Sequence, residues 1–177
     1  MRPSDKELIN RILQGESACW DLLAQRYYDE IYRYCYYRTG SEAAAADCTQ
    51  DTFLHAIQGL GSYVDKNKFR AWIFRIAANS CMDHFRRNKA VCVEQEVLDM
   101  QGEEDKGLKQ REDAEYVQAA LMKLSEVQKE VIILKFYHGF KIREIAGLLN
   151  LTIPAVKSHL KRGMDKLGKI MKGDEET

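Results

Sequence analysis

The chain has 177 residues, of which 31% are charged and 45% are hydrophobic, and its 27 basic side chains balance its 27 acidic ones. This length allows one or two domains, and no apolar run long enough for a membrane span or a secretory leader is present, so we expect no membrane insertion. Because the sequence has only two prolines and helical periodicity in most segments, we expect an all-α protein.

The first two predicted helices cover residues 5–14 and about 18–38, separated by Gly15. Ser17 is placed to cap the second helix. The apolar stripe of that helix consists of Trp20, Leu23, Tyr27, Ile31, Tyr34 and Cys35. We expect its tyrosines to lie in the core or at its rim rather than to bind a ligand.

A third helix is predicted over about 42–58, after Ser41 as its N-cap. One side of this helix is apolar or small. The opposite side carries Asp47, Gln50, Asp51 and Leu54. An acidic and amide face with one exposed leucine could dock another protein, whereas an ordinary solvated face is the simpler alternative from these residues alone.

A basic loop over 62–68 precedes a helix predicted over 69–87. One face of this helix is apolar. The other face carries Trp72, Arg75, Ile76, Asn79, Asp83 and Arg86. A mixture of aromatic, amide and guanidinium groups suits single-stranded nucleic acid, because flat groups stack on unpaired bases and cations follow the backbone. The alternative is that Trp72 packs beneath the preceding loop as part of the core.

Residues 90–113 are rich in acids and poor in large apolar side chains, which predicts a linker with at most nascent helix. An amphipathic pattern begins again at Ala114, and a further helix is predicted over about 126–137. His138 and Gly139 end that helix.

Residues 141–170 predict a helix-turn-helix, which is two short helices separated by a tight turn. Asn150 can end the first helix because Asn tolerates a left-handed backbone. Thr152 is a favourable N-cap for the second helix, and Pro154 lies near its first position, where a missing N–H costs nothing. A solvated helix in a bundle is the alternative to a DNA-binding unit.

The second helix of this unit has an apolar face and a basic face. On a helical wheel, the side chains predicted to face inward are Val156, Leu160, Gly163, Met164 and Leu167. Those predicted to face outward are Pro154, Lys157, Ser158, Lys161, Arg162 and Asp165. Short side chains at the start and cations further on suit a helix that enters a major groove while its cations hold phosphates.

The zero net charge hides a strong segregation of charge along the chain. Residues 62–89 carry seven bases and two acids, residues 90–113 carry three bases and eight acids, and residues 135–172 carry nine bases and two acids. Each basic block could bind a polyanion on its own, so the neutral total does not argue against nucleic-acid binding.

The five cysteines show no C-x-x-C spacing, and an odd number without a secretory leader indicates a reducing cytosol. Cys81 and His84 are three residues apart and could share a metal, but two further ligands are not evident. We therefore expect no metal and no cofactor, and thiols that mostly behave as small buried hydrophobes.

Three blocks of the chain, in this order, resemble the extracytoplasmic-function (ECF) class of bacterial RNA polymerase sigma factors. DCTQDTF at 47–53 is similar to the family pattern D-L-x-Q-E-x-F. FRAWIFRIAANSCMDHFRR at 69–87 is similar to F-x-x-W-L-x-x-I-A-x-N-x-x-x-D-x-x-R-R. The stretch from Leu124 to Leu167 resembles the family's C-terminal domain, with Ser125 in place of the usual proline and Pro154-Ala155 in place of Gly-Thr.

The resemblance implies two helical domains, residues 1–90 and 114–177, joined by an acidic linker over 91–113. The first domain would bind the polymerase clamp and read and open the minus-ten element, and the second would read the minus-thirty-five element as duplex. The implied polymerase contacts are Asp47, Gln50, Asp51 and Leu54. The implied contacts to the melted strand are Tyr63, Lys66, Lys68, Trp72, Arg75, Asn79 and Arg86. The implied contacts to duplex DNA are Thr152, Pro154, Ala155, Lys157, Ser158, Lys161 and Arg162.

The partners implied are core RNA polymerase, promoter DNA and an anti-sigma factor, in the cytoplasm. The alternative function is a LuxR-type regulator that binds duplex DNA as a dimer, because AVKSHLKRGMDKL also resembles the recognition helix of that family. The 42–87 blocks argue against it. An enzyme is not expected, because the sequence has no Gly-rich phosphate loop and no recognisable pair of nucleophile and base.

Overall fold

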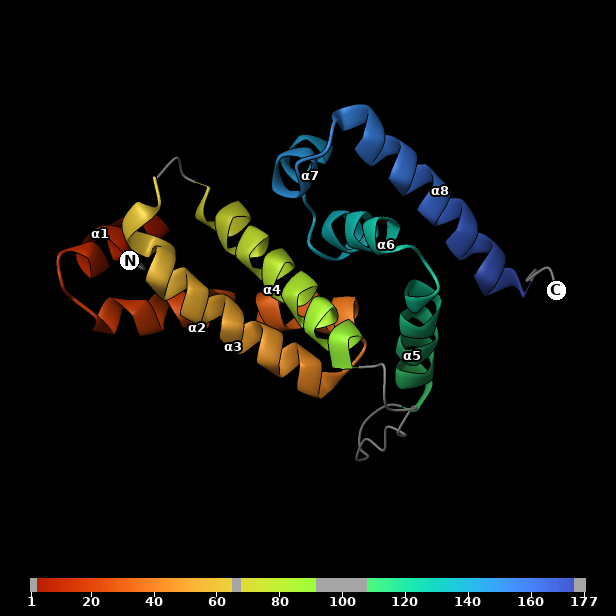
Figure 1. The fold of residues 1–177 in the computed structure, drawn as a ribbon, viewed down its shortest axis with the longest axis horizontal. Coiled ribbons are helices and arrows are strands. Elements are labelled where there is room, and N and C mark those ends of the chain that lie inside the picture. The colour runs from red at the N-terminus through yellow and green to blue at the C-terminus, as the bar shows by residue number, and fades with distance from the viewer. Residues whose placement is uncertain (1–2, 65–67, 92–107, 174–177) are drawn as a thin grey trace.

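The computed structural model describes residues 3–64, 68–91 and 108–173, and within these ranges the chain is helical and contains no strand (Figure 1). The all-α expectation is therefore confirmed. The elements are α1 (Asp5–Leu13), α2 (Ala18–Thr39), α3 (Glu42–Gly59), the 3₁₀ helix η1 (Leu60–Ser62), α4 (Phe69–Val91), α5 (Leu108–Met122), α6 (Glu126–Ile132), the π-helix η2 (Ile133–Tyr137), α7 (Ile142–Leu149) and α8 (Ile153–Lys172). None of these helices has the length and apolar character needed to cross a bilayer within the described ranges.

Short polar side chains set most of the helix starts. The Ser41 hydroxyl accepts from Ala44 N at 3.3 Å, and the Thr152 hydroxyl accepts from Ala155 N at 3.3 Å, as predicted. Asn150 has the predicted left-handed backbone, with φ of 55°. The prediction for Ser17 is wrong, because its backbone is already helical and its side chain makes no capping hydrogen bond.

Ser125, which stands where the ECF pattern usually has proline, forms a strong helix start at α6. The Ser125 hydroxyl accepts from Gln128 N at 3.4 Å, and the Gln128 side chain accepts from Ser125 N at 3.3 Å. This reciprocal capping box satisfies two backbone donors that a proline could not satisfy in the same way.

Two helix boundaries in the C-terminal half differ from the sequence expectation. The helix α5 begins at Leu108, six residues before the predicted start at Ala114, and so runs into the segment predicted to be a linker. The helix predicted over 126–137 is α-helical only to Ile132 and continues as a π-helix over Ile133–Tyr137. A hydrogen bond of 3.2 Å from His138 N to Ile133 O closes the π-helical turn. This wider turn leaves both Leu134 and His138 buried.

The N-terminal half is built from α2, α3 and α4, which lie side by side with α1 against α2 (Figure 1). Small residues such as Ala45 and Ala77 are fully buried, which lets the helix backbones approach closely. The buried side chains that fill this half include Leu23, Ile31, Tyr34, Ile73 and Phe74. The predicted stripe of α2 is thus mostly core, with Trp20 half-buried against Phe53.

The C-terminal half packs α8 across α6 and α7. A β-carbon at Gly163 would lie 2.9 Å from Ile132 Cδ1 and 3.2 Å from Gln128 Cβ, so α8 and α6 approach closely at this glycine. Gly163 is buried as predicted, but Met164 is 40% exposed, which corrects its inward assignment. The close approach at Gly163 leaves no room for a long side chain, and Met164 lies beside the contact rather than in it.

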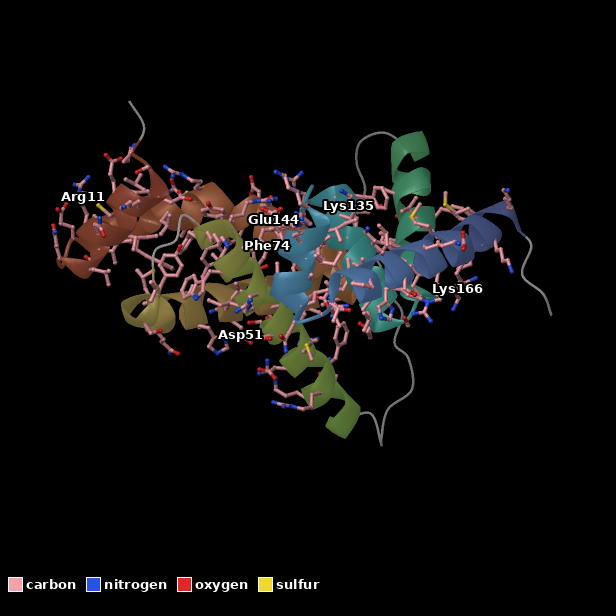
Figure 2. The ribbon with its side chains drawn as sticks, turned by 90° about the horizontal axis from the view of Figure 1, so that it is seen from above. Arg11, Asp51, Phe74, Lys135, Glu144 and Lys166 are labelled. Atoms are coloured by element: carbon pink, nitrogen blue, oxygen red, sulfur yellow. The ribbon has the colours of Figure 1, made fainter. Side chains whose placement is uncertain are left out.

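The two halves do not lie apart. A single cluster of buried side chains runs from α2, α3 and α4 into α6, η2, α7 and the start of α8. Figure 2 shows Phe74 of α4 in the middle of the molecule, where the C-terminal half lies over it, and Lys166 of α8 well away from it. The sequence predicted two separate small domains and gave no sign of this shared core.

Four cysteines, Cys19, Cys35, Cys48 and Cys81, are buried free thiols, and Cys92 lies outside the described residues. A hydrogen bond with Cys81 and burial both raise the pKa of the Cys48 thiol. A hydrogen bond with Cys35 and burial raise the pKa of Cys81. Protonated, buried thiols behave as small hydrophobes. No group of three or more candidate metal ligands occurs within the described ranges.

Candidate nucleic-acid and polymerase interfaces

The basic face of α8 is open to solvent. Its inner side is fixed by buried Val156, Gly163 and Leu167. The four side chains predicted to contact duplex DNA along the helix, Lys157, Ser158, Lys161 and Arg162, are all exposed. Within the described part of the chain, these four side chains make one hydrogen bond, from Arg162 Nε to Ser158 O at 3.4 Å in the same helix. The face therefore presents three cations and a hydroxyl to whatever approaches it.

The start of α8 presents short side chains. Thr152 and Pro154 are exposed, and Ala155 is half-buried. The left-handed Asn150 turns the chain sharply, so that α8 leaves α7 after only three connecting residues. A helix N-terminus with small side chains can approach base edges or phosphates closely, and its unpaired N–H groups carry a partial positive charge.

The second predicted nucleic-acid face, on α4, is partly covered. Arg75 and Asn79 are exposed on the same side of the helix. Both line a cavity of about 410 Å³ whose opposite wall is the helix-turn-helix turn, residues 147–151. The Arg75 guanidinium donates to Gly147 O at 2.5 Å. The structure thus brings this face against the C-terminal half, which the sequence did not indicate.

The remaining residues predicted to contact a melted strand are spread along α4 and the loop before it. Trp72 is half-buried, with its ring centroid 5.0 Å from that of Tyr63 and 5.4 Å from that of Phe69. Lys68 is exposed, and Lys66 lies outside the described residues. Arg86 is exposed and pairs with Asp83 at 2.9 Å. Trp72 packs on the loop, as the alternative interpretation supposed, and remains partly accessible.

The predicted docking face of α3 is largely exposed. Asp47, Gln50 and Leu54 are exposed, and Leu54 retains 48% of its surface. Asp51 is half-buried and accepts from Arg87 Nη2 at 2.9 Å. With Arg87, the α4 residues His84 and Asn88 complete a polar depression of about 310 Å³ beside the α3 carboxylates. These three residues were not assigned to this face from the sequence, although the turn spacing of α4 places them on one side.

The chain matches two protein families in order: Sigma-70 region 2 over residues 23–91, and Sigma-70, region 4 over residues 114–167. It is 31% identical over 175 residues to the ECF RNA polymerase sigma factor BldN of Streptomyces coelicolor, over 95% of this chain and 66% of BldN. The chain belongs to the ECF class of RNA polymerase sigma factors. This sigma factor therefore carries its α3 and α4 faces in region 2 and its α8 face in region 4.

Other relatives agree with this assignment. The sigma factor is 27% identical over 181 residues to the ECF sigma factor SigW of Bacillus subtilis, over 94% of this chain and 96% of SigW. It is similar to the solved structure of CnrH in complex with the cytosolic domain of CnrY, with a TM-score of 0.75, 26% identity, and coverage of 97% and 99% of the two chains. The chain thus spans about two thirds of BldN but nearly all of SigW and CnrH.

Family membership decides between the functions that the sequence left open. A LuxR-type regulator receives no support, because the N-terminal half matches sigma region 2 rather than a sensor domain. Sigma factors are initiation factors and not enzymes, so the expectation that the chain is not an enzyme is confirmed.

Proposed function

We propose that this sigma factor binds core RNA polymerase and directs transcription initiation at specific promoters in the cytoplasm, with residues 1–90 and 114–177 acting as the two functional domains joined by 91–113. The observation that carries the proposal is the order of its surfaces. A docking face, a face for unpaired bases and a basic recognition helix follow one another in the two matched sigma regions. An initiation factor needs these three surfaces in one chain.

The α8 face is proposed to read duplex DNA at the minus-thirty-five element. Ser158 and Arg162 lie on the exposed side, where they can reach base edges, and Lys161 is placed to hold phosphate. Thr152, Pro154 and Ala155 at the start of the helix are short enough to let the backbone come close to the groove. Lys157 flanks Ser158 and adds a second cation there.

The α4 face is proposed to bind the melted minus-ten strand. Asn79 offers amide groups to a base edge, and Arg75 offers a planar cation that can stack or hold phosphate. Trp72 is half-buried against Tyr63 and contributes the part of its side chain that stays accessible. Lys68 and Arg86 lie at the two ends of this proposed strand-binding face. Lys66 lies outside the described residues and is included because of its place in the sequence.

The α3 face is proposed to dock on the polymerase. Leu54 supplies an apolar contact at its centre, and Asp47 and Gln50 supply polar contacts around it. Asp51 already pairs with Arg87, so we expect it to act together with that residue. An anti-sigma factor is proposed as a further partner, consistent with a similar protein, CnrH, being solved in complex with another protein's cytosolic domain.

The experiment is a pull-down of core polymerase with the double variant Asp47→Arg with Gln50→Ala. Both side chains are exposed, so helicity and melting temperature should stay nearly unchanged while polymerase binding falls about tenfold or more. Asp29→Arg, on the exposed side of α2, is the matched charge-reversal control and should bind normally. Unaltered binding by the double variant would remove α3 from the polymerase interface.

A further inference from the structure

The first turn of α8 presents apolar side chains to solvent, whereas the outer face further along the helix carries cations. Ile153 is 38% exposed, Pro154 is exposed and Ala155 is half-buried. With about 100° between successive residues, Pro154 lies near the middle of the outward side, and Ile153 and Ala155 lie on its two flanks. We call these three residues the apolar tip. Figure 1 shows this end of α8 at the periphery of the molecule, next to α7.

The backbone of the first turn offers few hydrogen-bond donors to a ligand. Pro154 has no N–H, and the N–H of Ala155 already donates to the Thr152 hydroxyl at 3.3 Å. The next donor, Val156 N, bonds Thr152 O at 3.0 Å within the helix. A helix N-terminus binds phosphate through free N–H groups of this kind. The apolar tip is therefore poorly equipped to hold a phosphate and well equipped for an apolar contact.

The departure from the ECF pattern at this point has the same direction. The pattern usually has Gly-Thr where this chain has Pro154-Ala155. Glycine and threonine would supply a backbone N–H and a hydroxyl, both of which can form hydrogen bonds with bases or phosphates. Pro154 supplies neither, and yet it stays exposed. The change thus alters the chemistry of the surface rather than the packing of the helix.

The cations of α8 begin after the apolar tip. Lys157 is the first, and Lys161 and Arg162 follow about one turn later, all three exposed. A helix of 20 residues such as α8 is about 30 Å long, whereas the major groove is about 12 Å wide. Only the first turns of α8 can therefore lie deep in the groove. In that position the apolar tip is nearest the base edges, and the cations further along are nearer the phosphates.

Thymine is the standard base that presents an apolar group in the major groove, its C5 methyl. The other three bases present hydrogen-bonding groups at their exposed edges, and an apolar side chain would dehydrate these groups without replacing the lost hydrogen bonds. We propose that the apolar tip contacts thymine methyl groups, so that Ile153 and Pro154 determine specificity for thymine at the base pairs nearest the start of α8. This inference rests on the proposed reading of duplex DNA by α8. It adds Ile153 to the residues involved and names a base that they select.

The test removes the methyl group and leaves the rest of the DNA unchanged. The full chain first selects preferred sites from a randomised duplex of about 20 base pairs at low salt, where phosphate contacts support binding. Each thymine of the selected site is then replaced by deoxyuridine, which lacks only the C5 methyl. Replacement of a thymine that meets the apolar tip should weaken binding about fourfold, because a buried methyl group is lost. Deoxyuridine outside the selected site should have no effect.

A double variant assigns the methyl contact to the apolar tip. In Ile153→Ser with Pro154→Ser, Thr152 still caps the helix, and the loss of affinity caused by deoxyuridine should disappear. Met164→Ser is the matched control, because Met164 is 40% exposed and lies on the same flank of α8 as Ile153, about three turns later. This control should keep the loss. Circular dichroism verifies that both variants are folded, and the comparison of thymine with deoxyuridine in the wild-type protein needs no variant.

The outcomes separate this inference from the proposed function. Equal binding of the thymine and deoxyuridine sites by the wild-type protein overturns the methyl contact, while a changed sequence preference in Arg162→Ala would still support duplex reading by α8. A deoxyuridine effect that persists in the double serine variant overturns the assignment to Ile153 and Pro154. Selection that yields no preferred duplex sequence overturns the proposed role of α8, and this inference with it.

Discussion

The two predicted DNA-reading faces of this sigma factor differ in what surrounds them. The α8 face in region 4 is exposed along its length, and its cations meet nothing beyond their own helix among the described residues. The α4 face in region 2 looks toward a cavity walled by region 4, with Arg75 already engaged. The proposed duplex-reading face thus has no neighbour from the other half among the described residues, whereas the proposed strand-binding face has one in the turn between α7 and α8.

The difference agrees with the task proposed for each face. Duplex DNA is reached by a rigid helix that can stay exposed, because charged side chains are well solvated. The proposed face for unpaired bases relies on aromatic and amide groups, and of these Trp72 packs on the rings of Tyr63 and Phe69. The contact between the halves is apolar as well as polar, because one buried cluster includes Phe74 of α4 together with Phe140 and Ile145 of the C-terminal half.

The largest expected effect comes from removing the side chain of Arg38, which is buried in α2 and pairs with Glu126 and Glu130 of α6. Arg38→Ala leaves Glu130 buried without its cation, which should lower the free energy of unfolding by about 3–5 kcal/mol. Urea unfolding followed by circular dichroism measures this loss. Arg33→Ala should cost less than about 0.5 kcal/mol, because this exposed arginine of the same helix donates to Asp29 O at 3.3 Å and bonds no other group among the described residues. Equal, small losses in both variants would mean that Arg38 is not buried between the halves in solution.

The α8 face should make two kinds of contact with duplex DNA. Arg162→Ala should change the preferred duplex sequence, because a base contact by arginine carries about 1–3 kcal/mol of discrimination. Lys161→Ala should weaken binding to all sequences and reduce the slope of log affinity against log salt by about one. Selection from a randomised duplex at two salt concentrations separates the two. The division of this face is wrong if Arg162→Ala keeps the sequence preference and only flattens the salt dependence.

A smaller effect is expected near the turn before α7, where Arg70 of α4 donates from Nη2 to His138 O at 2.6 Å and from Nε to Glu30 Oε1 at 3.0 Å. Burial alone raises the pKa of Glu30, but hydrogen bonds from His138 and Arg70 outweigh it and lower this pKa to about 2. Because the folded pKa lies below the usual 4.5, the carboxylate stabilises the fold above about pH 4.5 and loses that effect as the pH falls toward 2.

Glu30→Gln should therefore cost of order 1 kcal/mol at pH 6, a value reduced by solvent screening because the carboxylate is partly exposed. The difference between Glu30→Gln and wild type should shrink at pH 3. The exposed neighbour Asp29→Asn serves as the control in the same denaturant titrations. A gap that stays constant between pH 6 and pH 3 would contradict the ionised pair with Arg70.

The sequence predicted most of this fold because its signals are local. Thr152, Asn150 and Ser41 act through their own turns, so their spacing was enough to place helix ends. The helical periodicity of α8 correctly predicted which side chains are buried, except for Met164. There the close approach of α8 to α6 at Gly163 leaves the Met164 side chain outside the contact. Ser17 shows the limit of the same signals, since a serine caps only when its backbone is extended.

The sequence could not predict the contacts between segments that are far apart along the chain. Arg38 follows Ile31 and Tyr34 at core spacing on α2, which was a signal for burial, but nothing local named Glu126 or Glu130 as its partners. In the same way Arg75 was correctly placed on a polar face, while the turn that covers it lies some 70 residues later in the chain. Pairing across that separation is set by tertiary packing rather than by periodicity.

The most direct test of the central claim is run-off transcription with purified core polymerase on a library of promoter-sized fragments from the source genome. We expect transcripts from a limited set of promoters only when this protein is added, and loss of those transcripts with Asp47→Arg and Gln50→Ala. Asn79→Ala should reduce open complexes more than closed ones. Duplex binding without any polymerase association or protein-dependent transcript would contradict the account.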